Sequence, residues 1–363
     1  MLIPELPAYL SSLGGAEHKG LIISLFTLTA MLSRPFSGKL ADRVGRVPVM
    51  IFGSGVCFIC SLIYPVLGTV WGFLLLRLVH GFSTGFTPTG QTAYVSDIIP
   101  AQRRGEAMGL IGTAGSVGMA SGPAIGGTIT NYFSLDVMFY VSSAFGLISI
   151  LILSGIRETL KEKHRLHPAV LKVDWADWFE PRVLVPCLVM VLCGYAYGAM
   201  FTIMPDLGAF MGMKNKGLLF TYLTGASLLV RLLGGKASDR WGRRPVLQVS
   251  TCVIAAAMLV VAMADTPFML VCGVVLYGLG QGSTSPTLLA WATDLSSEHH
   301  KGRGIASLYM FMELGIGIGA FASGWIYGNE PAHFFMTFCI CSLLAALAFL
   351  YLTIQRRTVK LAS

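Results

Sequence analysis

Long apolar runs alternate with short charged segments along most of the chain. Eleven of these runs are long enough to be helices that cross a bilayer, which takes about 20 apolar residues. The pattern predicts helices over residues 19–40, 48–67, 71–99, 104–131, 135–156, 183–206, 215–238, 245–264, 267–296, 302–328 and 332–354. The first segment, MLIPELPAYLSSLGG, is apolar but too short to cross. We expect it to be the end of a first helix that is truncated here.

The second half of the chain repeats the pattern of the first at a spacing of 197 residues. The phrase SRPFSGKLADRVGRVPV at 33–49 matches VRLLGGKASDRWGRRPV at 230–246, and KGL at 19–21 matches KGL at 216–218. IPEL at 3–6 also aligns with MPDL at 204–207, across a loop that is four residues shorter in the second half. Such internal periodicity fixes architecture. It predicts two parallel six-helix halves, 1–156 and 183–363, joined by a linker over 157–182.

Composition and charge place the predicted helices in a membrane and orient them. Hydrophobic residues make up 54% of the chain and charged residues only 12%, whereas soluble domains carry about 25% charged residues. One side of the predicted bundle holds 20 Lys and Arg, and the other holds only Lys19, Lys214 and Lys216. The positive-inside rule therefore predicts a cytoplasmic linker and C-terminus. We expect a monomeric, multi-pass plasma-membrane protein of the bacterial inner-membrane type, whose net charge of +8 reflects topology and not nucleic-acid binding.

The repeated charged phrase carries the most specific motif. GKLADRVGR at 38–46 resembles the signature loop of the major facilitator superfamily, and GKASDRWGR at 235–243 resembles its counterpart in the second half. RLVHG at 77–81 is similar to the fourth-helix signature. A further segment resembles the fifth-helix signature of the drug:proton antiporters in that superfamily, through Gly109, Gly118, Gly122, Pro123, Gly126 and Gly127. The resemblance covers the whole chain and implies an all-α membrane fold that works by alternating access.

The resemblance also implies a cytoplasmic gate in each half. In the family, the loop arginine meets an acid at the end of the fourth helix, which implies Arg43 or Arg46 with Asp97 and Arg240 or Arg243 with Asp294. The full predicted gate comprises Gly38, Asp42, Arg43, Gly45, Arg46, Asp97, Gly235, Asp239, Arg240, Arg243 and Asp294. The glycines would let helix ends approach and the chain turn tightly. The alternative is that these residues only fix topology and loop shape, but the distant Asp97 and Asp294 recur together with the loops.

The glycine-rich segment over 109–127 has two interpretations. In resembling antiporters it is thought to seal the transport path and limit leak. The alternative is plain close packing of small residues, with a bend at Pro123.

Ionisable residues inside predicted spans are costly and are candidates for transport and proton coupling: Glu5, Arg77, Asp206 and Glu313. Glu313 lies about eleven residues into its helix, roughly 16 Å deep, where desolvation favours proton uptake near neutral pH. Glu5 and Asp206 hold matching positions and are expected to bind cationic substrate or protons, or else to be water-exposed. Arg77 is expected to pair with one of these acids or an anionic substrate, or else to bond backbone carbonyls. Arg34 and Arg231 are expected to have structural or gating roles.

Other function classes lack their motifs. The Gly-Lys pairs at 38–39 and 235–236 miss the remaining residues of an ATP-binding phosphate loop. No enzyme constellation, cofactor motif or metal-ligand cluster is evident. We therefore expect proton-coupled efflux of a small lipophilic or cationic organic compound, with the substrate, protons and the lipid bilayer as partners. A sugar or metabolite exporter or facilitator of the same fold is the alternative, which the few Asn, Gln and Trp in the spans disfavour. A channel is conceivable, although paired halves favour alternating access.

Overall fold

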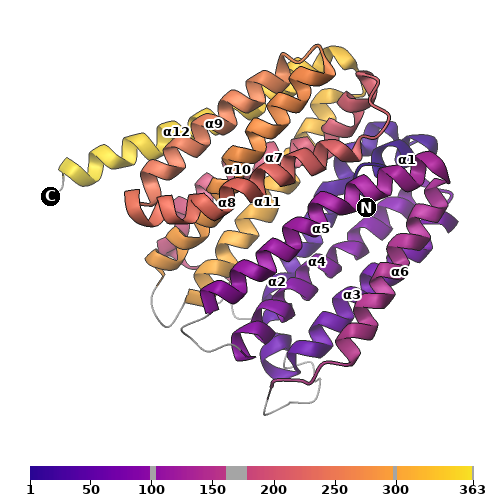
Figure 1. Ribbon diagram of the computed structural model, residues 1–363, viewed down its shortest axis with the longest axis horizontal. Helices are drawn as coiled ribbons and strands as arrows, with labels where there is room; N and C mark the ends of the chain where they lie inside the picture. The colour runs from indigo at the N-terminus through magenta and orange to yellow at the C-terminus, as the bar shows by residue number, and fades with distance from the viewer. Residues whose placement is uncertain (99–103, 161–177, 297–300, 362–363) are drawn as a thin grey trace.

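Helices form the regular structure throughout the part of the chain that is described. The computed structural model describes residues 1–98, 104–160, 178–296 and 301–361 (Figure 1). The first half contains α1 (Leu6–Ser12), α2 (Lys19–Arg43), α3 (Arg46–Ile63), α4 (Val70–Ile98), α5 (Arg104–Tyr132) and α6 (Leu135–Ser154). The second half contains α7 (Leu184–Phe210), α8 (Gly217–Trp241), α9 (Arg243–Ala262), α10 (Pro267–Leu295), α11 (Lys301–Tyr327) and α12 (Phe334–Leu361). Short 3-10 turns are η1 (Ala16–His18), η2 (Tyr64–Val66), η6 (Pro181–Val183) and η8 (Pro331–His333).

The eleven predicted helices are all present, with small differences at their ends. In the residues described, eight helices of 20 to 30 residues are long and apolar enough to cross a membrane. The helices α4, α5 and α8 have 29, 29 and 25 residues and lie among them. The helix α7 continues past Pro205 to Phe210, because a transmembrane helix tolerates an internal proline where neighbouring groups satisfy the freed carbonyl. The seven-residue α1 is too short to cross.

The outer surface of the bundle is apolar. Large side chains such as Phe145, Leu151 and Val249 are more than half exposed, at 56%, 62% and 67%. Water would disfavour so much exposed hydrocarbon, whereas bilayer lipid accommodates it. The surface therefore agrees with a multi-pass membrane protein.

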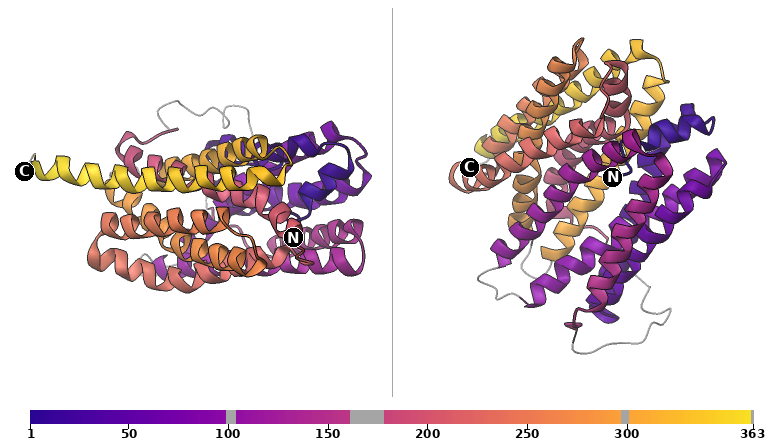
Figure 2. Two further views of the ribbon diagram at one scale, coloured as in Figure 1. Left: turned by 90° about the horizontal axis from the view of Figure 1, so that it is seen from above. Right: turned by 45° about the vertical axis from the view of Figure 1, so that its right-hand side comes forward.

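The two halves lie side by side and meet along two pairs of helices. Within the first half α2 and α3 pack on α4, and α6 packs on α3; within the second, α8 and α9 pack on α10. Between the halves, α2 packs against α11 and α5 against α8, which we call the α2–α11 seam and the α5–α8 seam (Figures 1 and 2). A shift of 197 residues carries α2 onto α8 and α5 onto α11. The two seams are therefore equivalent by the internal repeat.

Tight turns between α2 and α3 and between α8 and α9 each depend on one glycine. Gly45 has φ +142° and Gly242 has φ +90°, backbone conformations that favour glycine. The expectation for Gly38 is wrong in one respect. It lies inside α2, and a Cβ added there would meet nothing within 4 Å, so Gly38 neither makes a close approach nor turns the chain.

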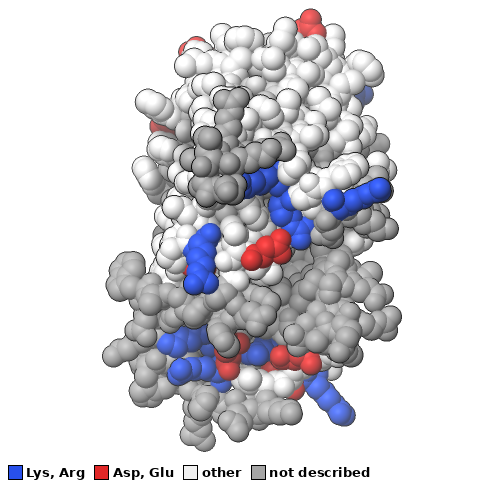
Figure 3. Space-filling view, turned by 90° about the vertical axis from the view of Figure 1, so that its left-hand side faces the viewer, with Lys and Arg blue, Asp and Glu red and all other residues white. Residues whose placement is uncertain are grey.

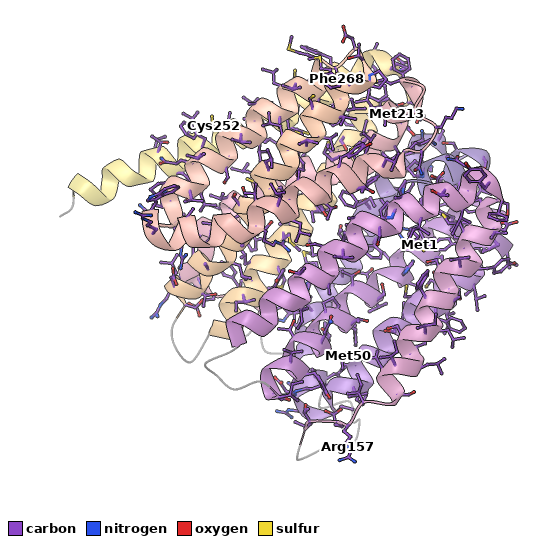
Figure 4. The ribbon with its side chains drawn as sticks, in the orientation of Figure 1. Met1, Met50, Arg157, Met213, Cys252 and Phe268 are labelled. Atoms are coloured by element: carbon purple, nitrogen blue, oxygen red, sulfur yellow. The ribbon has the colours of Figure 1, made fainter. Side chains whose placement is uncertain are left out.

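A groove of about 520 Å³ opens between α3, α4, α5 and α6, with Met1 at its edge (Figure 4). In the second half, Gly315 and Gly319 of α11 approach Val191 and Tyr195 of α7 closely. The equivalent glycines of α5 face the groove instead, where a Cβ on Gly118 would meet nothing within 4 Å. The groove thus lies where α7 lies in the second half. The expected truncated first helix stays a prediction.

Candidate functional site

The end of the bundle that carries Gly45 and Gly242, called here the basic end, holds two clusters of charge. Figure 3 faces this end and shows Lys and Arg side chains in two groups, each with acidic side chains beside it. In the first cluster, Arg46 bonds Asp97 at 3.1 Å and Asp42 at 2.9 Å, and donates to the carbonyl of Ala41. Of the two arginines that the sequence offered for Asp97, Arg46 makes the contact.

The second cluster repeats this arrangement. Arg243 Nε donates to Asp294 Oδ2 at 2.9 Å, and Arg243 Nη1 donates to Ser238 Oγ at 2.8 Å. Arg240, the other candidate, is exposed. Gly235 and Asp239 lie in α8, and Gly109 lies in α5. The contacts of these three residues fall outside the described part of the structure.

Glu158, just beyond α6, joins the first cluster and was not anticipated from the sequence. Its carboxylate accepts hydrogen bonds from the backbone N–H groups of Arg46 and Val47 at 3.0 Å each, at the first turn of α3. It also accepts from the N–H groups of Thr159 and Leu160. Partial burial opposes ionisation of Glu158, but the four N–H donors outweigh it and lower the pKa of this carboxyl below its ordinary value. The residue fastens the start of the linker to α3.

At the opposite end, called here the Lys19 end, the predicted carboxylates lie beside lysines. Lys19 at the start of α2 forms an ion pair with Asp206 of α7, with side chains 11% and 15% exposed. Glu5, the equivalent of Asp206, interacts electrostatically with Lys216, the equivalent of Lys19. Asp206 is therefore not water-exposed, and the expected binding of cationic substrate or protons by Glu5 and Asp206 stays a prediction. The charge of Asp206 is already balanced by a lysine from the other half.

Helix backbones come very close at this same end. A Cβ built on Gly20 would lie 2.7 Å from the carbonyl oxygen of Ala320. In the α5–α8 seam, a Cβ on Gly217 would collide with the carbonyl of Pro123, which is the equivalent of Ala320. The two halves thus touch at backbone distance in both seams.

Glu313 lies in the α2–α11 seam and is paired with Arg34. Arg34 Nη2 donates to Glu313 Oε1 at 2.9 Å, and their side chains are 12% and 5% exposed. The guanidinium also lies over the ring of Tyr309, at 5.0 Å from its centroid. The candidate proton-coupling carboxyl is therefore buried in an ion pair that joins the two halves.

Arg231 takes the equivalent place in the α5–α8 seam. Its Nη1 donates to Ser116 Oγ at 3.1 Å and to the carbonyl of Gly112 at 3.5 Å. Ser116 stands 197 residues before Glu313, so each arginine reaches the same position of the opposite half. Only the chemistry of the partner differs.

Arg77 does not meet an acid in the described residues, which corrects the expected pairing with Glu5, Asp206 or Glu313. Its Nε donates to the carbonyl of Ile22 at 2.9 Å, and Nη1 contacts the Tyr64 hydroxyl at 3.4 Å. The guanidinium lies 4.5 Å from the centroid of Phe26. At 3% exposure, Arg77 connects α2, α4 and η2 by bonding backbone and ring groups.

The antiporter-like segment of α5 faces two different neighbours. Gly126 and Gly122 lie against Met1, and Gly127 lies against Asn215, which donates to the carbonyl of Ala124 at 3.3 Å. Thr221 adds a bond to the carbonyl of Ala120 at 2.6 Å. The segment thus contributes part of the α5–α8 seam.

Comparison with known proteins agrees with this arrangement. The family model described as "Major Facilitator Superfamily" matches residues 1–223 and 214–362. The chain is 26% identical to the multi-drug resistance efflux pump PmrA of Streptococcus pneumoniae, over 99% of this chain and 92% of the relative. It is 26% identical to the multidrug resistance protein MdtG of Salmonella typhi, over 87% and 81%. The crystal structure of a D-xylose-proton symporter matches with a TM-score of 0.80 at 15% identity, over 97% of this chain and 91% of that one, which concerns the fold alone. The chain belongs to the Major Facilitator Superfamily and is a membrane transporter, not an enzyme.

Proposed function

We propose that this transporter couples the inward movement of protons to the efflux of a small lipophilic or cationic organic compound. The observation that carries the proposal is the buried Arg34–Glu313 ion pair across the α2–α11 seam. The likeness to PmrA and MdtG, both named for multidrug resistance, supports the choice of substrate class. The chain would act as a monomer in the bacterial inner membrane, with the basic end, the linker and the C-terminus in the cytoplasm.

Glu313 would be the proton-binding group. Its carboxylate is held by Arg34 from the other half, so a proton on Glu313 removes the charge that binds the seam together. The seam can then separate more easily, and the halves can change which side of the membrane they expose. Release of the proton on the cytoplasmic side restores the ion pair, so each conformational cycle would carry a proton inward.

The charged clusters at the two ends would have different roles. Contacts of Arg46 with Asp97 and of Arg243 with Asp294 lie within each half at the basic end. The Lys19–Asp206 pair connects the two halves at the other end. We propose that the first two hold the cytoplasmic gate in shape, while the third closes the outer side.

A proteoliposome assay tests the proposal. A pH-sensitive dye inside the vesicles reports proton movement while the cationic dye ethidium, or the sugar xylose, is added outside in turn. We expect ethidium to evoke proton movement in the wild type and Glu313→Gln to abolish it. Glu17→Gln, at an exposed glutamate of η1, is the matched control and should behave as the wild type.

Each other outcome has a definite meaning. Transport of ethidium without proton movement in either protein would refute coupling and leave a facilitator. A response to xylose and none to ethidium would favour the alternative, a sugar or metabolite carrier of the same fold.

A further inference from the structure

The two seams between the halves are equivalent by the repeat but differ in charge. Arg34 and Arg231 are 197 residues apart and are equivalent by the repeat. Each contacts a residue of the opposite half, and the two contacted residues, Glu313 and Ser116, are also 197 residues apart. Arg34 finds the carboxylate of Glu313 there. Arg231 finds the neutral hydroxyl of Ser116. The α5–α8 seam therefore contains a cation in a place where the α2–α11 seam contains an ion pair.

Arg231 has no carboxylate within ion-pair distance across the described ranges of the chain. Glu313 is bonded to Arg34 and does not replace the missing partner. Arg231 lies 14 residues after the start of α8, about 21 Å along the helix, so it is far from either end. An unbalanced guanidinium at such depth is costly, and this makes it a candidate functional group.

The guanidinium has donors to spare. Of its five N–H groups, the contacts to Ser116 and Gly112 both use Nη1, so Nε and Nη2 make no hydrogen bond in the described structure. Ser116 donates its own hydroxyl hydrogen to the carbonyl of Gly112 at 2.9 Å. A planar fork with free donors matches the two oxygens of a carboxylate.

Space and further polar groups lie nearby. A Cβ on Gly115, next to Ser116, would meet nothing within 4 Å. Tyr197 of α7 interacts electrostatically with both Arg231 and Glu313, and Tyr277 of α10 interacts with Tyr197. The Tyr277 side chain is fully buried, and its hydroxyl has no hydrogen-bond partner in the described structure. The aromatic ring of Tyr197 therefore lies within electrostatic range of the arginine, and Tyr277, which interacts with Tyr197, adds an unused hydroxyl donor near that ring.

We propose that Arg231 binds the carboxylate of a transported lipophilic compound in the α5–α8 seam, in the way that Arg34 binds Glu313. This adds lipophilic carboxylates, with an aromatic or aliphatic body beside Tyr197, to the substrate classes of the transporter. The inference rests on the proposed transport function, but it concerns binding, which is measured separately from proton movement.

Binding to the purified full chain in lipid nanodiscs tests the inference. The probes are 1-naphthoate and its uncharged analogue 1-naphthamide, titrated by calorimetry in chloride-free buffer at neutral pH. We expect the wild type to bind naphthoate about tenfold more tightly than naphthamide, because one charge-assisted bidentate contact distinguishes them. Arg231→Gln should remove the preference.

The internal repeat supplies a sharper variant and its control. Ser116→Glu places a carboxylate where Glu313 stands in the other seam, so it should pair with Arg231 and abolish the naphthoate preference while naphthamide still binds. Ser116→Gln has the same size without the charge and should retain most of the preference. Thermal unfolding of each variant shows whether it is folded, and Ser116→Glu should be at least as stable as the wild type.

Three results in chloride-free buffer would overturn the inference. These are no preference for naphthoate in the wild type, an equal loss in Ser116→Gln and Ser116→Glu, or a preference that survives Arg231→Gln. Loss of naphthoate binding when chloride is added at physiological concentration would also overturn it, since Arg231 would then hold a simple ion. If proton coupling fails while the naphthoate result stands, the proposed antiport is wrong and the binding site is not.

Discussion

Removal of the Glu313 carboxylate should destabilise the protein more than removal of its arginine partner. The two side chains are 5% and 12% exposed and bond at 2.9 Å. Glu313→Gln leaves the Arg34 guanidinium buried without its counter-charge, and breaking a buried pair in this way costs about 3–5 kcal/mol. Arg34→Gln costs less at neutral pH, because an isolated buried carboxyl can take up a proton, whereas a guanidinium cannot lose one.

The expected shift can be measured by thermal unfolding of the protein in nanodiscs. For 363 residues, about 2.1 cal/mol/K per residue gives an unfolding entropy of roughly 0.8 kcal/mol/K, so Glu313→Gln should lower Tm by about 4–7 °C. The double variant Arg34→Gln, Glu313→Gln removes both charges and should fall by less than half as much. A double variant whose Tm falls by the sum of the two single shifts would refute the reasoning, since it would show that the two groups do not interact.

Three further predictions concern the two ends of the bundle. Gly45→Ala should lower stability by more than Gly242→Ala in thermal unfolding, because both positions have positive φ, worth about 1–3 kcal/mol, but only at Gly45 would the new Cβ also collide with Glu158. The stability difference between the wild type and Glu158→Gln should be constant above pH 4.5, the ordinary pKa of the carboxyl, and should vanish as pH falls through the lower pKa that Glu158 has in the folded protein. The reason is that the hydrogen bonds favour the ionised carboxylate, so their contribution is lost when Glu158 is protonated. A difference that grows on acidification would contradict this. Lys19→Asp should slow ethidium transport several-fold, and Asp206→Lys in addition should restore most of it, as one buried pair predicts; no recovery in the double variant would show that the pair is not required.

Much of the fold could be predicted from the sequence because hydrophobic length and internal repetition are direct consequences of the bilayer. The ends of α5 and α10 were predicted to within a residue, since charged or polar residues mark where each helix leaves the apolar layer. The helix predicted over 183–206 ends four residues before α7 does at Phe210, because a packed membrane bundle lets the helix continue past the internal Pro205.

The site could be predicted only as far as its residues repeat. Arg46 with Asp97 and Arg243 with Asp294 follow from motifs that stand in both halves. The pairing of Arg34 with Glu313 was missed. The sequence did carry a signal for it, since the shift that aligns Arg34 with Arg231 also aligns Ser116 with Glu313. What the sequence does not encode directly is that α2 meets α11 and α5 meets α8 across the halves.

Glu158 shows a different limit. Nothing in the sequence around it distinguishes it from other charged residues of the linker. Its role depends on the backbone N–H groups of Arg46 and Val47, which reach its carboxylate only when α3 and α6 are packed together. A contact of this kind is a property of the assembled chain.

The close backbone contact of Gly20 with α11 gives the molecule a fulcrum near one end of α2. This helix has 25 residues, about 37 Å, so a tilt of about 10° around that point displaces its far end by roughly 6 Å. Groups near the fulcrum, such as Lys19, move little, whereas the turn at Gly45 sweeps the full arc. A small local change at Arg34 would therefore produce a larger opening between the helices at the distant end. A bulky residue in place of Gly20 would disrupt the fulcrum without changing the charge of any side chain.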